Sequence, residues 1–250
     1  MPEFEHFKNA PIREALIDIR ATLPPEIDLS VLEKFQDEIK ARFPERKKRV
    51  FWENRLEFHG ENPPQVTPKG GPDGYLFKSP NEQKVVQARR DGFTFNKLKP
   101  YDHWDIFRNE AKELWDRYLK IAKPTKITRI VLRYINCIEI PIVKPEVALE
   151  DYVLIYPEIP KDFPYKLANF LTVMEVLDIE NEITARINIS MEPIKSEGKT
   201  LPLIFDIDAY RMLDLDPNDQ KIWEIFETLR TFKNKIFFGS MTEKSKELFR

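Results

Sequence analysis

The chain has 250 residues, of which 42% are hydrophobic and 33% charged, with 40 Lys and Arg against 42 Asp and Glu. This mixture is too apolar for wholesale disorder, and it lacks the basic excess of proteins that neutralise many phosphates. One cysteine forms neither an internal disulfide nor a cysteine-rich zinc site, and no apolar run approaches the roughly 20 residues of a membrane span. We therefore expect a soluble, cytoplasmic protein without cofactor or metal, whose composition argues against membrane and nucleic-acid partners.

The first half of the sequence begins with a strand and then a helix. Apolar residues alternate from Ala15 to Leu23, which predicts the strand. Asp28 or Ser30 can cap a helix that ends at Pro44 and buries apolar residues at helical spacing. Further strands are predicted at Arg49–Phe58, Tyr75–Ser79, Lys84–Arg90 and Phe93–Leu98.

Proline and glycine mark the turns between these strands. Asn62–Gly74 holds four prolines and three glycines, which predicts a surface loop. Asp91-Gly92 is typical of a two-residue hairpin. Asp102 is the predicted N-cap of a helix that stops at Lys123-Pro124.

The second half repeats this order. A long strand is expected at Ile127–Ile140 and a short helix at Val147–Val153, and Asp216-Pro217 is expected to open a last helix. The remaining strands are predicted at Phe170–Leu177, Ile183–Met191 and Leu203–Met212. After the last helix, Ile236-Phe237-Phe238 is interpreted either as a partner contact or as a terminal strand.

The spacing of the two rounds indicates an internal duplication. Ile127 follows Ala15 by 112 residues, and Asp216 follows Asp102 by 114. We predict an α+β fold of two similar halves, 1–124 and 125–250, each a mostly antiparallel sheet with helices on one face. The TATA-binding protein's saddle has an arrangement of this kind. The alternative is a single α+β domain in which the spacing is coincidental.

Charged residues on the predicted strands are the candidate ligand site. Side chains two or four apart on a strand share one face, so charges from several strands can converge. Arginines and carboxylates on one face can bind a phosphorylated or nucleotide ligand, or act as an acid–base pair. The alternative is cross-strand ion pairing on a solvated face. The candidate residues are Arg89, Arg129, Arg133, Glu175, Asp206 and Asp208.

A compact basic run is the candidate nucleic-acid contact. It comprises Arg46, Lys47, Lys48 and Arg49 and follows the first predicted helix. Such a run can touch phosphates, but a charge run beside a helix end also fits a solvated surface.

Four segments together resemble a sporadically distributed, uncharacterised prokaryotic family of about 250 residues. They are Asn9–Ala15, Pro100-Tyr101 with Trp104, Leu132–Asn136 with Ile140-Pro141, and Ile236–Glu243. The resemblance spans nearly the whole chain but implies no activity, cofactor or catalytic residue. The sporadic distribution is typical of mobile genes, including defence genes.

The sequence contains no G-x-S-x-G, S-x-x-K or Walker-type motif. The leading hypothesis is therefore a non-enzymatic protein-interaction module of a mobile or defence-related system, whose partner is a protein or a second copy in a homodimer. The alternatives are an enzyme or binding protein for a phosphorylated ligand, and a nucleic-acid-binding protein.

Overall fold

The computed structural model describes the chain except residues 1–3, 58–64, 144–146, 161, 163–166 and 195–198. The described residues form one nine-stranded sheet in the order β2-β3-β4-β5-β1-β6-β9-β8-β7, and every neighbouring pair is antiparallel. The strands are β1 Ile12–Thr22, β2 Glu45–Glu57, β3 Gln65–Lys78, β4 Lys84–Arg89, β5 Gly92–Leu98, β6 Lys126–Pro141, β7 Leu171–Asp178, β8 Ile183–Met191 and β9 Thr200–Leu215.

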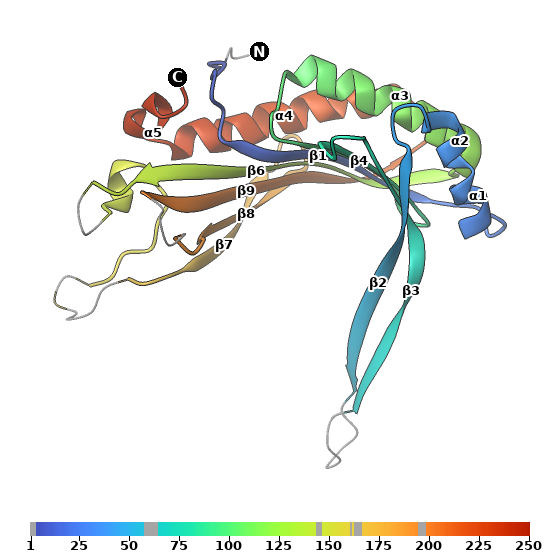
Figure 1. Ribbon diagram of the computed structural model, residues 1–250, viewed down its shortest axis with the longest axis horizontal. Coiled ribbons are helices and arrows are strands. Elements are labelled where there is room, and N and C mark those ends of the chain that lie inside the picture. The colour runs from blue at the N-terminus through green and yellow to red at the C-terminus, as the bar shows by residue number, and fades with distance from the viewer. Residues whose placement is uncertain (1–3, 58–64, 144–146, 161, 163–166, 195–198) are drawn as a thin grey trace.

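The helices cover one face of this sheet (Figure 1). They are α1 Leu29–Glu33, α2 Phe35–Ile39, α3 Trp104–Ala122, α4 Lys221–Ser240 and α5 Glu243–Glu247, with a 3₁₀ turn at Leu149–Asp151. The β2–β3 hairpin at one end and β7 at the other bend away from the helices, so the sheet is arched and its helix-free face is concave (Figure 1). The structure is therefore α+β with two layers, as the sequence predicts in outline.

The core lies between the sheet and the two long helices. Strands β1 and β6 pair at the centre, and their alternating apolar side chains face the helices; Ile17, for example, is opposite Leu132 and both are fully buried. Helix α3 contributes Trp115 and Tyr118, and α4 contributes Phe226. Because successive side chains of a strand point to opposite faces of the sheet, the same strands present polar residues on the face away from the helices.

The boundary expected between residues 124 and 125 falls between α3 and β6, but it does not separate two independent sheets. Strand β1 from the first part pairs with β6 from the second along ten registered positions, from Ile12 opposite Asn136 to Thr22 opposite Lys126. The strands on both sides of the boundary therefore form one continuous sheet.

The described part of the predicted loop at Asn62–Gly74 is instead strand, so that prediction was wrong. Gln65–Gly74 continues β3 and pairs with β2, with Pro72 opposite Val50. Strand β4 pairs with β3 only from Gly74 onward, so the earlier part of β3 has an open side. Proline is tolerated in a strand where its missing N–H faces no partner.

Two predicted helices differ in extent. The first is split into α1 and α2 at Lys34, although Asp28 caps it as expected and accepts from the N–H groups of Ser30 and Val31. The last begins at Lys221, after a turn in which Asp216 accepts from Asn218, and continues through Ser240.

The segment Ile236-Phe237-Phe238 belongs to α4, so the expected terminal strand was wrong. Phe237 is 6% exposed and packs on Phe205, and Phe238 stacks on Phe7, so these rings contact the protein's own core. None of the helices described is long and apolar enough to cross a membrane.

Candidate functional site

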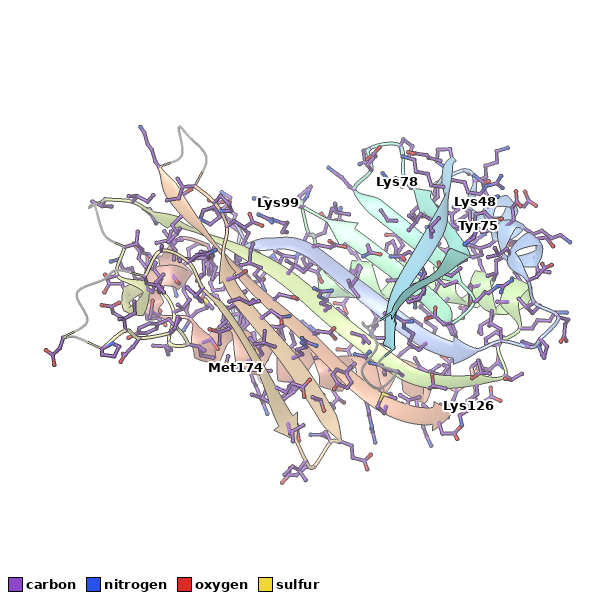
Figure 2. All side chains as sticks on the ribbon, turned by 90° about the horizontal axis from the view of Figure 1, so that it is seen from below. Lys48, Tyr75, Lys78, Lys99, Lys126 and Met174 are labelled. Atoms are coloured by element: carbon purple, nitrogen blue, oxygen red, sulfur yellow. The ribbon has the colours of Figure 1, made fainter. Side chains whose placement is uncertain are left out.

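The six strand residues predicted as a ligand site all lie on the helix-free face, which Figure 2 views from below. Four adjacent strands carry a row of alternating charge, because Arg133 of β6 is opposite Asp208 of β9, which is opposite Arg186 of β8. Arg186 in turn is opposite Glu175 of the edge strand β7. The face is thus patterned so that each charge has a neighbour of opposite sign.

Arg133 and Asp206 form the best-defined pair on this face. Arg133 donates from Nε and Nη2 to the two carboxylate oxygens of Asp206, each at 2.8 Å, and Asn188 donates to the same carboxylate at 3.0 Å. The hydrogen bonds that Arg133 donates to Asp206 raise the pKa of the Arg133 guanidinium. The carboxylate is therefore already occupied by protein donors and is a poor candidate for binding a metal.

Arg89 is the most deeply buried arginine among the six. It is 3% exposed, donates to Thr94 at 2.8 Å, and lies 2.7 Å from the carboxylate of Asp18. Burial lowers the pKa of Arg89, and the charge of Asp18 opposes that shift. Arg89 is a structural member of the sheet and lies too deep to receive a ligand without displacing Asp18.

Arg129 and Asp208 are less completely paired. Their closest charged atoms are 3.9 Å apart, and the buried Oδ1 of Asp208 and Nε of Arg129 have no hydrogen-bond partner among the described residues. The guanidinium carbon of Arg129 is instead 4.2 Å from the ring centroid of Tyr210. Burial raises the pKa of Asp208, because no close hydrogen bond compensates its desolvation.

The basic run of residues 46–49 lies inside β2 and not after a helix end. Because side chains alternate along a strand, Arg46 and Lys48 are on one face and Lys47 and Arg49 on the other. Arg46 pairs with Glu33 at 2.7 Å, and Arg49 pairs with Asp73. Figure 2 places Lys48 beside Tyr75 of β3, its registered partner. The four charges therefore do not form one patch.

A second candidate site is a pocket of about 260 Å³ on the helix side of the sheet. It is lined by the N-terminal segment, the start of α3 and the C-terminal half of α4. The backbone N–H of Asn9 donates to the carbonyl of Phe249 at 2.8 Å, which fixes the N-terminal segment there. The pocket exceeds the roughly 150 Å³ of an apolar cavity that binds benzene.

Lys233 of α4 lines this pocket and is 8% exposed. Its ammonium nitrogen is 3.8 Å from the ring centroid of Tyr134, and within the described chain it has neither a carboxylate nor a hydrogen-bond partner. A buried lysine is ordinarily paired, because burying an uncompensated charge is costly. Burial, and secondarily the charge of Arg230, lowers the pKa of Lys233 to about 7. A large share of the side chain is therefore the neutral amine at neutral pH.

Two tyrosines from different elements meet in the same pocket. The hydroxyl groups of Tyr101 and Tyr134 are 2.6 Å apart, and either can donate. Burial raises the pKa of both phenols well above the ordinary value, so they remain neutral hydrogen-bonding groups. Together with Trp104 they make an aromatic lining around Lys233.

The lining changes from buried and aromatic to exposed and charged across the pocket. Tyr134, Trp104 and Phe237 are buried, whereas His6 and His103 are exposed and stack with ring centroids 4.2 Å apart. The exposed residues indicate the side on which the pocket meets solvent. Its basic side chains are Lys8, Arg230, Lys233 and the two histidines, and its acidic side chains are Glu5 and Asp102.

The sequence predictions missed Lys233, although one signal marks it. Leu229, Lys233 and Phe237 are spaced four residues apart, which places the lysine in the buried stripe of α4. All four segments that carry the family resemblance also contribute to the pocket, through residues such as Pro11, Tyr101, Asn136 and Phe238.

Comparison with known proteins adds no assignment. No protein-family model matches the chain, and no curated protein matches it in sequence. Within the described residues there is also no cluster of three or more histidine, cysteine or acidic side chains that could hold a metal ion.

Proposed function

We propose that the protein binds a small organic anion in the pocket around Lys233. The observation that carries this proposal is the buried amine of Lys233, which lines the cavity and is paired with no carboxylate among the residues that the structure describes. A ligand carboxylate or similar anion would supply the missing counter-charge, and the aromatic lining would contact an apolar body. Arg230, one helical turn earlier on α4, lines the same cavity and adds a second cation.

The proposal is tested with benzoate and its neutral analogue benzamide at pH 6.5, where Lys233 is mainly charged. Isothermal titration calorimetry should show tighter binding of benzoate than of benzamide. Lys233→Met should weaken benzoate binding at least about tenfold, the size expected for one charge-assisted hydrogen bond. Lys235→Met is the matched control, because Lys235 is exposed on the same helix and does not line the pocket. Equal binding of the two compounds, or an unchanged affinity in Lys233→Met, would refute the proposal.

A second candidate function is self-association through the edge strand β7. Leu171, Val173 and Leu177 are 69%, 46% and 67% exposed on the concave face. A twofold axis at Met174 would pair Leu171 with Leu177 of a second copy, and exposed edge strands are templates for such pairing. This supports a homodimer over pairing with an unrelated chain, because the axis brings together the two most exposed apolar side chains of the strand, Leu171 and Leu177.

The dimer is tested by sedimentation velocity over a concentration series. Leu177→Asp should shift the species to monomer, because it places a charge opposite an apolar side chain of the second copy. Val143→Asp is the control, since Val143 is 84% exposed and lies outside β7. A monomer at all concentrations in the unaltered protein would contradict this assignment.

We also infer that the two halves derive from one repeated unit. Counting outward from the centre, β1 is followed by β5, β4 and β3 and then by the additional edge strand β2, and β6 is followed by β9, β8 and β7. Each half then ends in a long helix, α3 or α4. Superposing β1 with β6 and α3 with α4 is the check, and a failure of the other strands to overlay would contradict the duplication.

A further inference from the structure

We propose that Lys233 forms an imine with the carbonyl carbon of an oxo acid, which is an aldehyde or ketone that also carries a carboxylate. This inference rests on the proposed function. The ligand of the pocket would then be an oxo acid, and Lys233 would bind it covalently. The inference follows from three features of the pocket lining: an amine that has neither a carboxylate nor a hydrogen-bond partner among the described residues, a second cation on the same helix, and a pair of neutral hydroxyl groups.

The first feature is the state of the amine. A lysine is nucleophilic only as the neutral amine, and desolvation in an apolar pocket is one established way to produce it. Lys233 is surrounded by Tyr134 and Phe237 and is 8% exposed. Its lowered pKa of about 7 means that about half of the molecules carry the neutral amine at pH 7, against about 0.04% for an ordinary lysine.

The second feature is the position of Arg230. Residues three apart on a helix lie on one side, and both Arg230 and Lys233 line the pocket. Among the described residues, Arg230 pairs with the carboxylate of Glu227 at 3.5 Å, and the guanidinium carbon of Arg230 lies 5.6 Å from the ring centroid of Trp104. Arg230 can therefore bind the carboxylate of a ligand while the carbonyl group of the same ligand lies beside the amine of Lys233.

The third feature is the hydroxyl pair of Tyr101 and Tyr134. The nitrogen lone pair of Lys233 forms a C–N bond to the carbonyl carbon, the C=O π bond breaks, and one of the two amine protons moves to the oxygen, which becomes a hydroxyl. The carbinolamine then loses this hydroxyl together with the remaining N–H proton as water, and the C=N bond forms. Amine and carbonyl thus give imine and one water, with no oxidant or reductant. The neutral hydroxyl groups of Tyr101 and Tyr134 line the same pocket and would hydrogen-bond the oxygen during this exchange.

The test is reductive trapping with sodium cyanoborohydride, with 4-formylbenzoate or pyruvate as the carbonyl compound and benzaldehyde as the neutral comparison. Peptide mass spectrometry should find the adduct on Lys233 at least about tenfold faster than on Lys235 at pH 7, because so little of an ordinary lysine is unprotonated. Adduct formation on Lys233 should be slower with benzaldehyde, which lacks the carboxylate. Trapping on Lys233 no faster than on Lys235 would overturn the inference.

Lys233→Arg separates this inference from the proposed function. The arginine keeps a cation in the pocket but cannot form the trapped imine, so benzoate binding should persist while the adduct at residue 233 disappears. If the unaltered protein binds benzoate but gives no adduct at Lys233, the imine fails and the anion site stands. If neither benzoate binding nor an adduct is found, both fail.

Discussion

Arg89 of β4 and Asp18 of β1 form an ion pair across the intervening strand β5, with 2.7 Å between Nη2 and Oδ2 and side chains only 4% and 9% exposed. Thr94 of β5 lies between them and donates to Asp18 at 2.7 Å while accepting from Arg89 at 2.8 Å. The three side chains connect three strands of the concave face. A buried pair of this kind is costly to break from one side, because the remaining charge stays desolvated.

Asp18→Asn should therefore lower the free energy of unfolding by about 3 kcal/mol or more, measured by urea denaturation. The double variant Asp18→Leu with Arg89→Met should recover part of that loss, since it removes both charges. Asp214→Asn serves as the control, because Asp214 pairs with Lys126 at 2.5 Å with its side chain 74% exposed, and should change stability by less than about 1 kcal/mol. A similar cost for Asp18→Asn and Asp214→Asn would show that the buried pair is not structural.

Glu227 joins the two long helices at one carboxylate. It accepts a hydrogen bond from Trp104 Nε1 of α3 at 2.7 Å and also pairs with Arg108 of α3. Glu227→Ala should cost about 2 kcal/mol in thermal or urea unfolding, because a charged hydrogen bond and a half-buried partner are both lost. Glu224→Ala, on the exposed side of the same helix, should be within about 0.5 kcal/mol of the unaltered protein. An equal effect of the two substitutions would contradict this role.

Gly92 begins β5 at a position that only glycine fits. Its φ is +140°, and an added Cβ would lie 2.1 Å from the carbonyl oxygen of Ile19 on β1. Gly92→Ala should lower the free energy of unfolding by about 3 kcal/mol or more, since it combines backbone strain with a clash against a central strand. Gly239→Ala has open space around its Cβ and lies in α4, so it should be neutral or stabilising by up to about 1 kcal/mol. Full stability of Gly92→Ala in the same denaturation assay would refute the strain.

The strand pattern of this protein was largely predictable, because alternation of apolar residues is a local signal. The hairpin between β4 and β5 was confirmed, but its two turn residues are Arg90 and Asp91 and not Asp91-Gly92, because Arg89 of β4 pairs with Gly92 of β5. The long hairpin was missed, because proline and glycine favour a loop when the neighbouring strand is unknown. Ile236-Phe237-Phe238 resembles a strand in isolation, but its rings pack on Phe205 and Phe7 as the end of a helix, and tertiary packing decides such cases.

The placement of charges was predictable in one respect and not in another. Period-two spacing correctly predicts that Asp206 and Asp208 share a face. Their different environments depend on neighbours from other strands: Asp206 is held by Arg133 and Asn188, whereas Asp208 has a buried oxygen without a partner among the described residues. Lys233 was missed for a similar reason. Its lack of a carboxylate partner among the described residues depends on how the N-terminal segment, α3 and α4 pack together in the folded protein.

The unpaired lysine should also make stability depend on pH in a defined direction. The pKa of Lys233 is about 7 in the folded protein, against about 10.4 for an unfolded lysine. Between these values the unfolded chain binds more protons than the folded one, so the free energy of unfolding rises with pH. Below pH 7 both states are protonated and the full cost of burying the charge is present.

Lys233→Met removes this titration while keeping a flexible apolar side chain in the pocket. We subtract the free energy of unfolding of the unaltered protein from that of Lys233→Met. This difference should be largest at pH 6.5 and should decrease by about 1 kcal/mol per pH unit from about pH 7.5 to 9.5. Other groups, including the buried tyrosines, titrate in both proteins and cancel in the difference. The measurement is urea denaturation of both proteins at matched ionic strength, with Lys235→Met expected to show no such slope. A stability difference that does not change over this pH range would mean that Lys233 stays charged in the folded protein, and that its amine is not the neutral nucleophile on which imine formation depends.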